Sequence, residues 1–344
     1  MTTTQPVKKN NARPEHARGD VRDAVARYRA FHDEAGGGDV DARKSGYEDM
    51  VKGYYDLVTD FFEHGWGDSF HFAPRHRGES FNESIRRHQH FLAARLGLKP
   101  GMRVLDVGCG VGGPMRSIAR FSGASVVGVN NSKHQLQKAE KYNHQAGLAD
   151  RCELLEADFM HLPAPQGTFD AVYGFEATCH APDKTGLFRE LFRVLAPGGE
   201  LGAYEWCLTD RYDPNDPEHH RIKKGIEEGD GLPDIWTIPQ TLDALRAAGF
   251  EIVENEDRAL SSDPETPWHL PLTGRELSWT GVRRTWWGRR LARGVIMALE
   301  AVGKAPDGSR EISEMLHRGA DALVKGGDTG IFTPMFYFRA RKPA

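Results

Sequence analysis

The sequence predicts an α/β fold in which a Rossmann-like parallel sheet carries helices on both faces. The first observation is the stretch 103–114, RVLDVGCGVGGP, where a short apolar strand runs into glycines at positions 108, 110, 112 and 113. Glycine permits a turn with positive φ and a close approach of the backbone to a ligand, and the helix that follows offers unpaired N–H groups. The second observation is the alternation of strand-like and helix-like segments through residues 103–194, which is typical of crossover connections.

The region before the sheet is predicted to be helical after a polar start. Residues 1–20 are polar and lack periodicity, which indicates disorder. Apolar residues at helical spacing predict helices over 21–31, 55–63 and 81–98. His88 lies on the apolar face of the last of these, a place more typical of a core histidine than of a catalytic one. We divide this part of the chain into a flanking segment, 1–45, and a pair of substrate-side helices, 46–100.

The core elements follow in order. Strands are predicted at 104–108, 125–130, 153–157, 169–175, 200–207, 251–257 and 331–339. Helices are predicted at 113–121, 133–146, 185–195 and 239–248. The ligand-binding core therefore covers 101–259, and 260–344 forms a C-terminal region that includes the last core strand.

The residues that end the strands are candidate ligand contacts, because ligands in such sheets bind beyond the carboxyl ends of the strands. Gly108, Gly110 and Gly113 match G-x-G-x-x-G, a spacing shared by dinucleotide and S-adenosylmethionine binders. A nicotinamide enzyme is expected to carry an acidic residue after the second strand, where this chain has Asn130 and Asn131. Asparagine can still hydrogen-bond a ribose hydroxyl, but the missing acidic residue counts against both a dinucleotide cofactor and the commonest methyltransferase pattern.

Acidic residues elsewhere favour S-adenosylmethionine. Asp106 stands two positions before the first glycine, where an anion would stabilise a cationic sulfonium. Asp158 and Phe159 end the third strand with an acceptor for an adenine amino group beside a ring that can stack. Together with Gly112 in the glycine turn, these residues form the predicted cofactor contacts.

The segment 54–72, YYDLVTDFFEHGWGDSFHF, gathers aromatic side chains around Asp60 and Glu63 and continues into Trp66. An amphipathic helix with an aromatic core stripe explains much of it. Acidic residues within an aromatic run, followed by a Gly-Trp-Gly turn, also suit a pocket that needs both π faces and negative charge. Such a pocket would hold a cation.

These motifs together resemble the sterol 24-C-methyltransferases, which are class I S-adenosylmethionine-dependent methyltransferases. The resemblance covers about residues 45–343, with the motifs in the same order and at similar spacing. They are YYDLVTDFFEHGWGDSFHF (54–72), LDVGCGVGGP (105–114), FEATCHAP (175–182), YEW (204–206), IEEGDGLP (226–233), PWHLPLTG (267–274) and IFTPMFYFRARKP (331–343).

The resemblance implies methyl transfer to the side-chain double bond of a sterol, on a class I methyltransferase sheet with a C-terminal lid subdomain. An alkene is already a nucleophile, so the main catalytic task is to stabilise the carbocation that methylation leaves. Asp60, Glu63, Trp66 and Glu176 are the candidates, and Glu176, at the end of the fourth strand, is also a candidate cofactor contact. A proton must then leave, and we leave open whether His88, His180 or a carboxylate accepts it.

Two positions depart from the family pattern. Phe62 stands where these enzymes commonly carry tyrosine, so a hydroxyl is absent while the ring remains. After the second strand the family's tyrosine-glutamine pair reads His134-Gln135, and we expect the retained Gln135 to contact the cofactor. The first departure bears on the pattern of products and not on the reaction.

The C-terminal half contains two segments outside the core pattern. Residues 208–238 form a long insertion, and loops of that length are often lids, which would exclude water from a carbocation. Residues 283–297, RRTWWGRRLARGVIM, mix arginines and tryptophans ahead of an apolar helix. This pattern suits both an anionic membrane surface and a packed lid helix, and a sterol substrate favours peripheral membrane contact.

Composition excludes several classes. The chain has 344 residues and a formal net charge of −4, which argues against nucleic acid as a partner. It has no apolar run of membrane-spanning length and no secretory signal, so we expect a cytoplasmic protein. The four cysteines lack the spacing of a zinc site, so no metal is expected. Homo-oligomerisation is left open.

Other functions remain as alternatives. On the same fold, the substrate would be another lipid alkene, as in a cyclopropane-forming enzyme, or a small amine or phenol. From different classes, a nicotinamide-dependent oxidoreductase and a non-catalytic lipid-binding protein remain.

Overall fold

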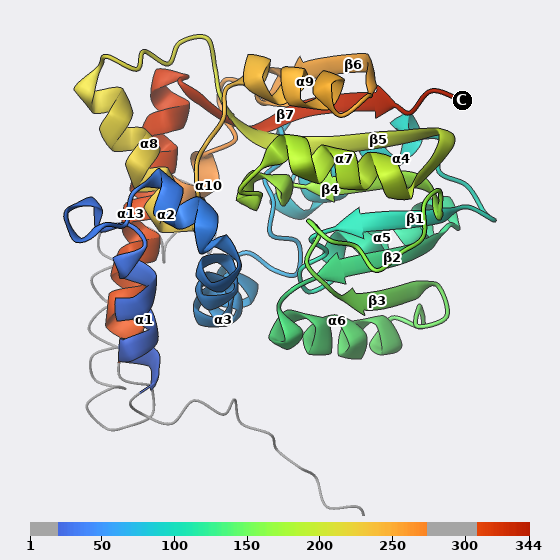
Figure 1. Ribbon diagram of the computed structural model, residues 1–344, viewed down its shortest axis with the longest axis horizontal. Helices are drawn as coiled ribbons and strands as arrows, with labels where there is room; N and C mark the ends of the chain where they lie inside the picture. Colours follow the sequence, from blue (N-terminus) through green and yellow to red (C-terminus); the bar gives the residue numbers. More distant parts are fainter. Residues whose placement is uncertain (1–19, 274–307) are drawn as a thin grey trace, which may run out of the picture.

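The computed structural model describes residues 20–273 and 308–344, which form a sheet with helices on both faces and a group of helices at one end (Figure 1). The predicted disorder of 1–20 falls almost entirely outside these residues, as does the basic and aromatic segment 283–297. The strands are β1 (Arg103–Val107), β2 (Ser125–Asn130), β3 (Cys152–Glu156), β4 (Phe169–Phe175), β5 (Leu195–Leu208), β6 (Glu251–Asp257) and β7 (Phe332–Arg341). The predicted α/β fold is confirmed.

The sheet order places the loops that follow β1 and β4 side by side. The described strands run in the order β3-β2-β1-β4-β5-β7-β6, with β7 antiparallel to both of its neighbours. From β1 the chain moves outward through β2 and β3, and it then returns to β4 on the other side of β1. This reversal is the switch point at which α/β sheets bind ligands.

Two hydrophobic cores cover the two faces of the sheet. The helices α4 (Phe81–Arg95) and α5 (Gly113–Ser122) pack on one face, and α7 (Lys184–Val194) and α9 (Ile238–Ala247) pack on the other. Successive side chains of a strand point to opposite faces. Leu105 and Val107 of β1 therefore lie in the α7 and α9 core, whereas Val104 lies in the α4 and α5 core. A further helix, α6 (Lys133–Gln145), connects β2 to β3.

A group of helices stands beyond the carboxyl ends of the parallel strands (Figure 1). They are α1 (Asp20–Ala30), α2 (Val40–Ser45), α3 (Tyr47–Gly65), α8 (Pro217–Asp230), α10 (Leu270–Thr273) and α13 (Ser309–Thr329). Of these helices, α1, α3 and α13 share a core in which Tyr28, Tyr54 and Met315 are almost fully buried, and α8 packs with α13 in a neighbouring cluster. We call this group the helical cap. None of the described helices is both long and apolar enough to cross a bilayer.

The predicted insertion 208–238 is not a loop throughout, because α8 occupies its middle. The Asp216 side chain accepts a hydrogen bond from the backbone N–H of Glu218, and Pro217 holds the first helical position. Ile222 and Ile226 are buried with residues of α13, and Gly231 ends the helix in the left-handed conformation. The sequence signals for this helix were its cap and its proline.

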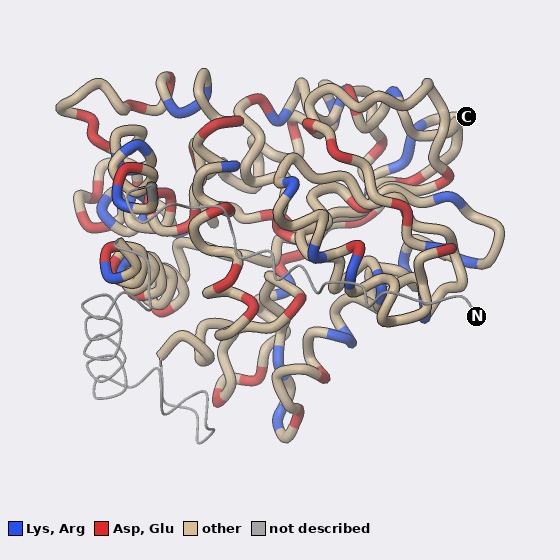
Figure 2. The backbone as a smooth tube through the Cα atoms, turned by 90° about the horizontal axis from the view of Figure 1, so that it is seen from below, with Lys and Arg blue, Asp and Glu red and all other residues tan. Residues whose placement is uncertain are grey.

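Charged residues of both signs are interspersed along the described chain (Figure 2). Many form exposed ion pairs between elements, such as Lys325 of α13 with Glu218 of α8 and Arg103 of β1 with Glu153 of β3. Exposed pairs of this kind contribute little to stability, so the two hydrophobic cores and the cap core carry most of it.

Candidate active site

The glycine turn after β1 forms one wall of a narrow cavity at the switch point. Its lining comes from the ends of β1, β2, β3 and β4 and from α3 and the chain that follows α3. The lining includes Tyr47, Tyr55, Phe70, His71, Gly108, Cys109, Gly110, Val111, Asn130, Asn131, Gln135, Phe159, Glu176 and His180. We call this space the nucleotide cavity.

The glycines of the turn have separate reasons to lack a side chain. Gly108 has φ of 72°, and a Cβ there would lie 2.5 Å from the Cβ of Ala177 in the loop after β4. Gly110 has φ of 54°, and a Cβ there would meet only a ring carbon of Phe70 at 3.9 Å. Gly108 therefore lets the two loops pack together, whereas Gly110 leaves room for a ligand.

Asn130 and Gln135 connect the nucleotide cavity to α3. The Asn130 amide donates to Gln135 Oε1 at 2.6 Å, and the Gln135 amide donates to Thr59 Oγ1 at 3.0 Å. The Asn130 side-chain oxygen accepts from the backbone N–H of Asn131 at 2.9 Å. The hydrogen bonds orient these amides at the edge where the sequence predicts a ribose.

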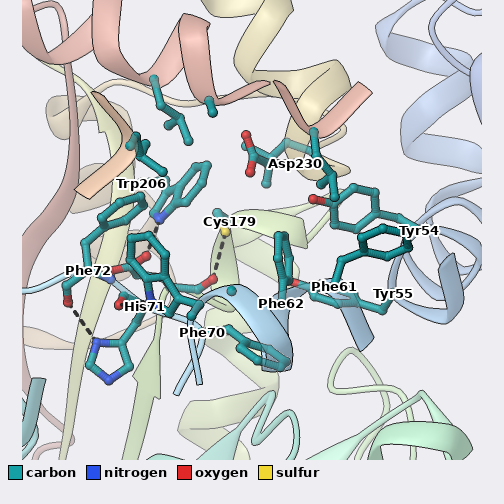
Figure 3. A pocket seen from close by; sticks show the side chains of 18 of the residues that line it. Tyr54, Tyr55, Phe61, Phe62, Phe70, His71, Phe72, Cys179, Trp206 and Asp230 are labelled. Atoms are coloured by element: carbon teal, nitrogen blue, oxygen red, sulfur yellow. Dashed lines mark hydrogen bonds between the residues drawn. The ribbon is translucent and has the colours of Figure 1, made fainter. Parts of the chain in front are cut away.

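A second cavity of about 310 Å³ lies between the sheet and the helical cap, and aromatic residues dominate its walls (Figure 3). Its lining includes Tyr54, Tyr55, Phe61, Phe62, Trp66, Phe70, Phe72, Glu176, Cys179, His180, Trp206, Asp230, Leu272, Leu316 and Leu323. We call this space the aromatic cavity. It would accommodate an apolar ligand that reaches the sheet end through the cap.

The two cavities share a wall. Tyr55, Phe70, His71, Glu176 and His180 line both of them. A group bound in one cavity therefore meets a group bound in the other at these five side chains. This wall is where a transfer reaction between two ligands would occur.

Glu176 is held in an unusual conformation within the shared wall. It is the one described non-glycine residue with a positive φ, 53°, which costs on the order of 1–3 kcal/mol. Its Oε1 accepts the backbone N–H of Phe72 at 2.7 Å, and its Oε2 accepts Nε1–H of Trp206 at 2.8 Å. Burial raises the pKa of Glu176 well above its ordinary value, although both hydrogen bonds oppose the shift.

Asp230 is a candidate site residue that the sequence did not reveal. It ends α8, lines the aromatic cavity, and its Oδ2 atom is buried without a hydrogen-bond partner (Figure 3). Burial raises its pKa to about 8. An unpartnered carboxyl among aromatic rings is costly unless a cation shares the space. The one sequence feature that marks Asp230 is the glycine on each side of it in IEEGDGLP.

His180 and Tyr55 form a hydrogen-bonded pair in the shared wall. The Tyr55 hydroxyl lies 2.8 Å from His180 Nε2, and His180 Nδ1 lies 3.0 Å from the carbonyl oxygen of Gly231. Burial lowers the pKa of His180 to about 4. Of the two histidines proposed as proton acceptors, only this one reaches the cavities.

Asp60 and Glu63 lie on the other face of α3 and line neither cavity. Lys138 of α6 contacts Asp60 at 2.7 Å and Glu63 at 2.5 Å, and the Tyr142 hydroxyl donates to Glu63 at 2.7 Å. The hydrogen bond from His134 and the charge of Lys138 hold the pKa of Asp60 far below its usual range. These two candidates for stabilising the carbocation therefore lie outside the lining of both cavities, and they dock α3 on α6.

Trp66, at the end of α3, does line the aromatic cavity, and its Nε1–H donates to the carbonyl oxygen of His71 at 3.1 Å. His88 does not reach either cavity. Its ring stacks on Tyr204 with centroids 3.6 Å apart, and burial lowers its pKa well below the ordinary value. The structure therefore assigns His88 to the core of the α4 face.

Three predicted cofactor residues stand behind the lining. Asp106 shares a face with Val104, accepts the Tyr173 hydroxyl at 3.1 Å, and has a pKa raised to about 7 by burial. Gly112 ends the turn at the start of α5. Asp158 accepts the Tyr47 hydroxyl at 2.5 Å and the backbone N–H of Met160, while its neighbour Phe159 lines the cavity.

Two family models match the sequence. "Methyltransferase domain" covers residues 105–202, and "Sterol methyltransferase C-terminal" covers 279–344. Among solved structures, the fold is similar to the cyclopropane synthase MmaA2 of Mycobacterium tuberculosis (TM-score 0.65, 19% identity, 85% of this chain and 97% of that one). It is also similar to geranyl diphosphate C-methyltransferase from Streptomyces coelicolor A3(2) (TM-score 0.59, 17% identity, 86% and 97%). At such identities the likeness concerns the fold alone.

Curated relatives match nearly the whole chain. Cycloartenol-C-24-methyltransferase 1 of Oryza sativa subsp. japonica is 52% identical over 324 residues, 94% of this chain and 93% of that protein. Sterol 24-C-methyltransferase ERG6 of Saccharomyces cerevisiae is 43% identical over 333 residues, 94% of this chain and 86% of that protein. Because such identity extends through the core and the helical cap alike, the chain belongs to the sterol 24-C-methyltransferase family.

Proposed function

We propose that this enzyme transfers a methyl group from S-adenosylmethionine to the side-chain double bond, at the 24-position, of a sterol. The observation that carries the proposal is the shared wall, which joins a glycine-turn cavity to an aromatic cavity that contains two buried carboxyl groups. The family relatives are named for this reaction.

The nucleotide cavity fits S-adenosylmethionine. Gly110 leaves space for a ligand against the turn, the amides of Asn130 and Asn131 stand where a ribose would be held, and the Phe159 ring can stack on adenine. The bound cofactor supplies an electrophilic methyl group. A cofactor held in the nucleotide cavity would have the shared wall between it and a ligand in the aromatic cavity.

The aromatic cavity suits an alkene that becomes a cation. The alkene needs no base to attack, but the attack leaves a positive charge on a tertiary carbon of the substrate. The rings of Phe62 and Trp66 offer π faces, each contributing about 0.5–2 kcal/mol when desolvated. Asp230 and Glu176 place two buried carboxyl groups against this space, and a cation beside them favours the ionised forms that burial alone disfavours.

Burial of the site protects the cation from water. Leu232, Leu272, Leu316 and Leu323 line the aromatic cavity with apolar side chains. Water that reached the cation would add to it and form an alcohol. We therefore infer that α8 and α13 serve as the cover that the sequence predicted for this region.

The proposal is tested with purified enzyme, labelled S-adenosylmethionine and a panel of Δ24-sterols, other unsaturated lipids and amines. Product masses are read after separation. We expect label in the sterol fraction with one methyl group added. Label confined to the amines or to cyclopropane products would overturn the substrate assignment.

Membrane contact through residues 283–297, homo-oligomerisation and a cytoplasmic location also belong to this proposal. The first rests on sequence alone, because these residues lie outside the described part of the chain. Flotation with anionic vesicles tests it, and analytical ultracentrifugation tests self-association. We expect the protein to bind anionic vesicles, and this binding to weaken as the salt concentration is raised.

A further inference from the structure

The hydrogen bonds around His180 determine which of its nitrogen atoms carries the proton. The carbonyl oxygen of Gly231, 3.0 Å from Nδ1, can only accept, so Nδ1 must be the donor. In the neutral ring Nε2 then has a free lone pair, and it accepts the Tyr55 hydroxyl proton at 2.8 Å. Hydrogen bonds are thus donated in one direction, from the Tyr55 hydroxyl to His180 and from His180 to the backbone carbonyl of the turn after α8.

This direction leaves the Tyr55 oxygen with lone pairs available at the shared wall. Tyr55 and His180 line both cavities, and their rings meet edge to face with centroids 5.3 Å apart. The Tyr55 oxygen is therefore an acceptor at the place where the methyl group would be delivered.

We infer that Tyr55 and His180 together remove the proton that ends the reaction, with Tyr55 touching the substrate and His180 receiving the charge. The inference rests on the proposed function. The C–H bond next to the cationic carbon breaks, its electrons form the new C=C bond, and the proton passes to the Tyr55 oxygen. The Tyr55 hydroxyl proton passes at the same time to His180 Nε2, and the imidazolium later loses a proton to water.

The other groups facing this pair are less suited to the task. Glu176 already accepts one hydrogen bond on each oxygen. Asp230 stabilises the cation in its ionised form, and it would lose that charge by accepting the proton. Cys179 donates to the carbonyl oxygen of Glu176, and Lys184 is ion-paired with Glu205 at 3.0 Å.

His71, the other imidazole of the shared wall, donates from Nδ1 to the carbonyl oxygen of Phe72 at 2.8 Å and accepts the Gln89 amide on Nε2 at 2.9 Å, so neither of its nitrogen atoms is open to the substrate. The Tyr55 oxygen keeps lone pairs on the side of the cavities.

Neutral His180 is a strong enough base to receive the proton that leaves the carbocation. Burial lowers the pKa of His180 to about 4 and raises the pKa of the Tyr55 hydroxyl well above its ordinary value. The imidazole is therefore neutral and able to accept at neutral pH. A carbocation is a far stronger acid than imidazolium, so a weak base is sufficient, and the low basicity favours the later release of the proton.

The test uses the wild type, Tyr55→Phe and His180→Gln with a Δ24-sterol and S-adenosylmethionine carrying a trideuteriomethyl group. The sterol product retains two deuterium atoms if the proton leaves the new methyl group, and three if it leaves the sterol. Tyr55→Phe keeps the ring but removes the oxygen. His180→Gln can still accept the Tyr55 hydroxyl but cannot take up a proton. Both variants should lower kcat about tenfold or more with small changes in KM.

The variants should also change the products, because a cation without its base is trapped by water or loses another proton. We expect alcohols or a shifted ratio of two to three retained deuterium atoms. Tyr28→Phe is the matched control. It also loses a buried hydroxyl bonded to a carbonyl near the end of α8, that of Glu228 at 2.6 Å, but it lines neither cavity. It should keep the wild-type products and kcat.

The outcomes separate the two proposals. A wild type that does not methylate the sterol refutes the proposed function. A wild type that does so, with variants that match it in kcat and products, refutes the proton-accepting pair. If His180→Gln is normal and only Tyr55→Phe is impaired, His180 merely orients the hydroxyl and the inference also fails. Should Tyr55→Phe not fold, as judged by circular dichroism, His180→Gln decides the question.

Discussion

Gly229 of α8 and Gly319 of α13 pack backbone against backbone, so that a Cβ on Gly229 would lie 2.2 Å from the Cα of Gly319. Asp230 follows Gly229 directly and ends α8. The crossing of two cap helices therefore determines how far the Asp230 carboxyl reaches into the aromatic cavity. Small residues at such a crossing allow the closest approach of two helices.

We predict that Gly319→Ala forces α8 and α13 apart, because its Cβ would lie 2.7 Å from the Cα of Gly229. The free energy of unfolding should fall by about 1–3 kcal/mol, and turnover should fall with it. Gly53→Ala on α3 is the control, since an added Cβ there meets nothing within 4 Å. Urea denaturation compares the two. Equal stability of both variants would contradict the close crossing.

A second prediction concerns Asp230→Asn. The pKa of Asp230 is raised from 3.8 to about 8 in the folded protein. Between these pH values the folded chain holds a proton that the unfolded chain has lost, so this group makes stability fall as pH rises. Asparagine removes that dependence. At pH 8 the variant should therefore have a higher melting temperature than the wild type, and at pH 4 this difference should be much smaller. Turnover should be lost.

Thermal unfolding at several pH values, with sterol methylation measured at each, checks this prediction. The control is Asp243→Asn on the exposed side of α9, which removes a carboxylate outside the site. A constant difference in melting temperature between Asp230→Asn and the wild type would show that Asp230 is not a buried, titrating group.

The sheet and the glycine turn were predictable because their signals are local. Strands β2 and β6 have the boundaries that the sequence predicts, and Gly108 and Gly110 line the nucleotide cavity as expected. A glycine turn after an apolar strand depends on neighbouring residues alone. Its conformation can therefore be predicted without knowledge of the rest of the fold.

The roles of Asp60, Glu63 and Asp230 were not predictable for a shared reason. Helical spacing shows which residues of α3 share a face, but it does not show what each face meets. The aromatic face of α3 meets the cavity, and the face with Asp60 and Glu63 meets Lys138 of α6. Asp230 enters the site only because α8 packs on α13, a contact between distant parts of the sequence.

A third prediction follows for Glu63→Gln. Loss of the carboxylate removes one of the two charge partners of Lys138, leaves Asp60 as the other, and weakens the bond from Tyr142, so α3 should dock less firmly on α6. We expect about 1–2 kcal/mol of lost stability and weaker binding of S-adenosylhomocysteine, with kcat nearly unchanged. Calorimetry and steady-state kinetics measure these quantities, with Asp49→Asn on the exposed start of α3 as control. A large fall in kcat at unchanged affinity would return Glu63 to the reacting centre.

The last prediction separates backbone strain from ligand space at the glycine turn. Gly110 and Gly147 both have positive φ, 54° and 66°, so alanine should cost roughly 1–2 kcal/mol at either position. An added Cβ at Gly147 meets nothing within 4 Å, whereas at Gly110 it enters the nucleotide cavity beside Phe70. Gly110→Ala should therefore weaken S-adenosylhomocysteine binding by about tenfold or more, equivalent to about 1.4 kcal/mol, and Gly147→Ala should leave it unchanged. Denaturation and titration calorimetry on both variants give the comparison. Equal affinities would mean that the ligand does not approach the turn at Gly110.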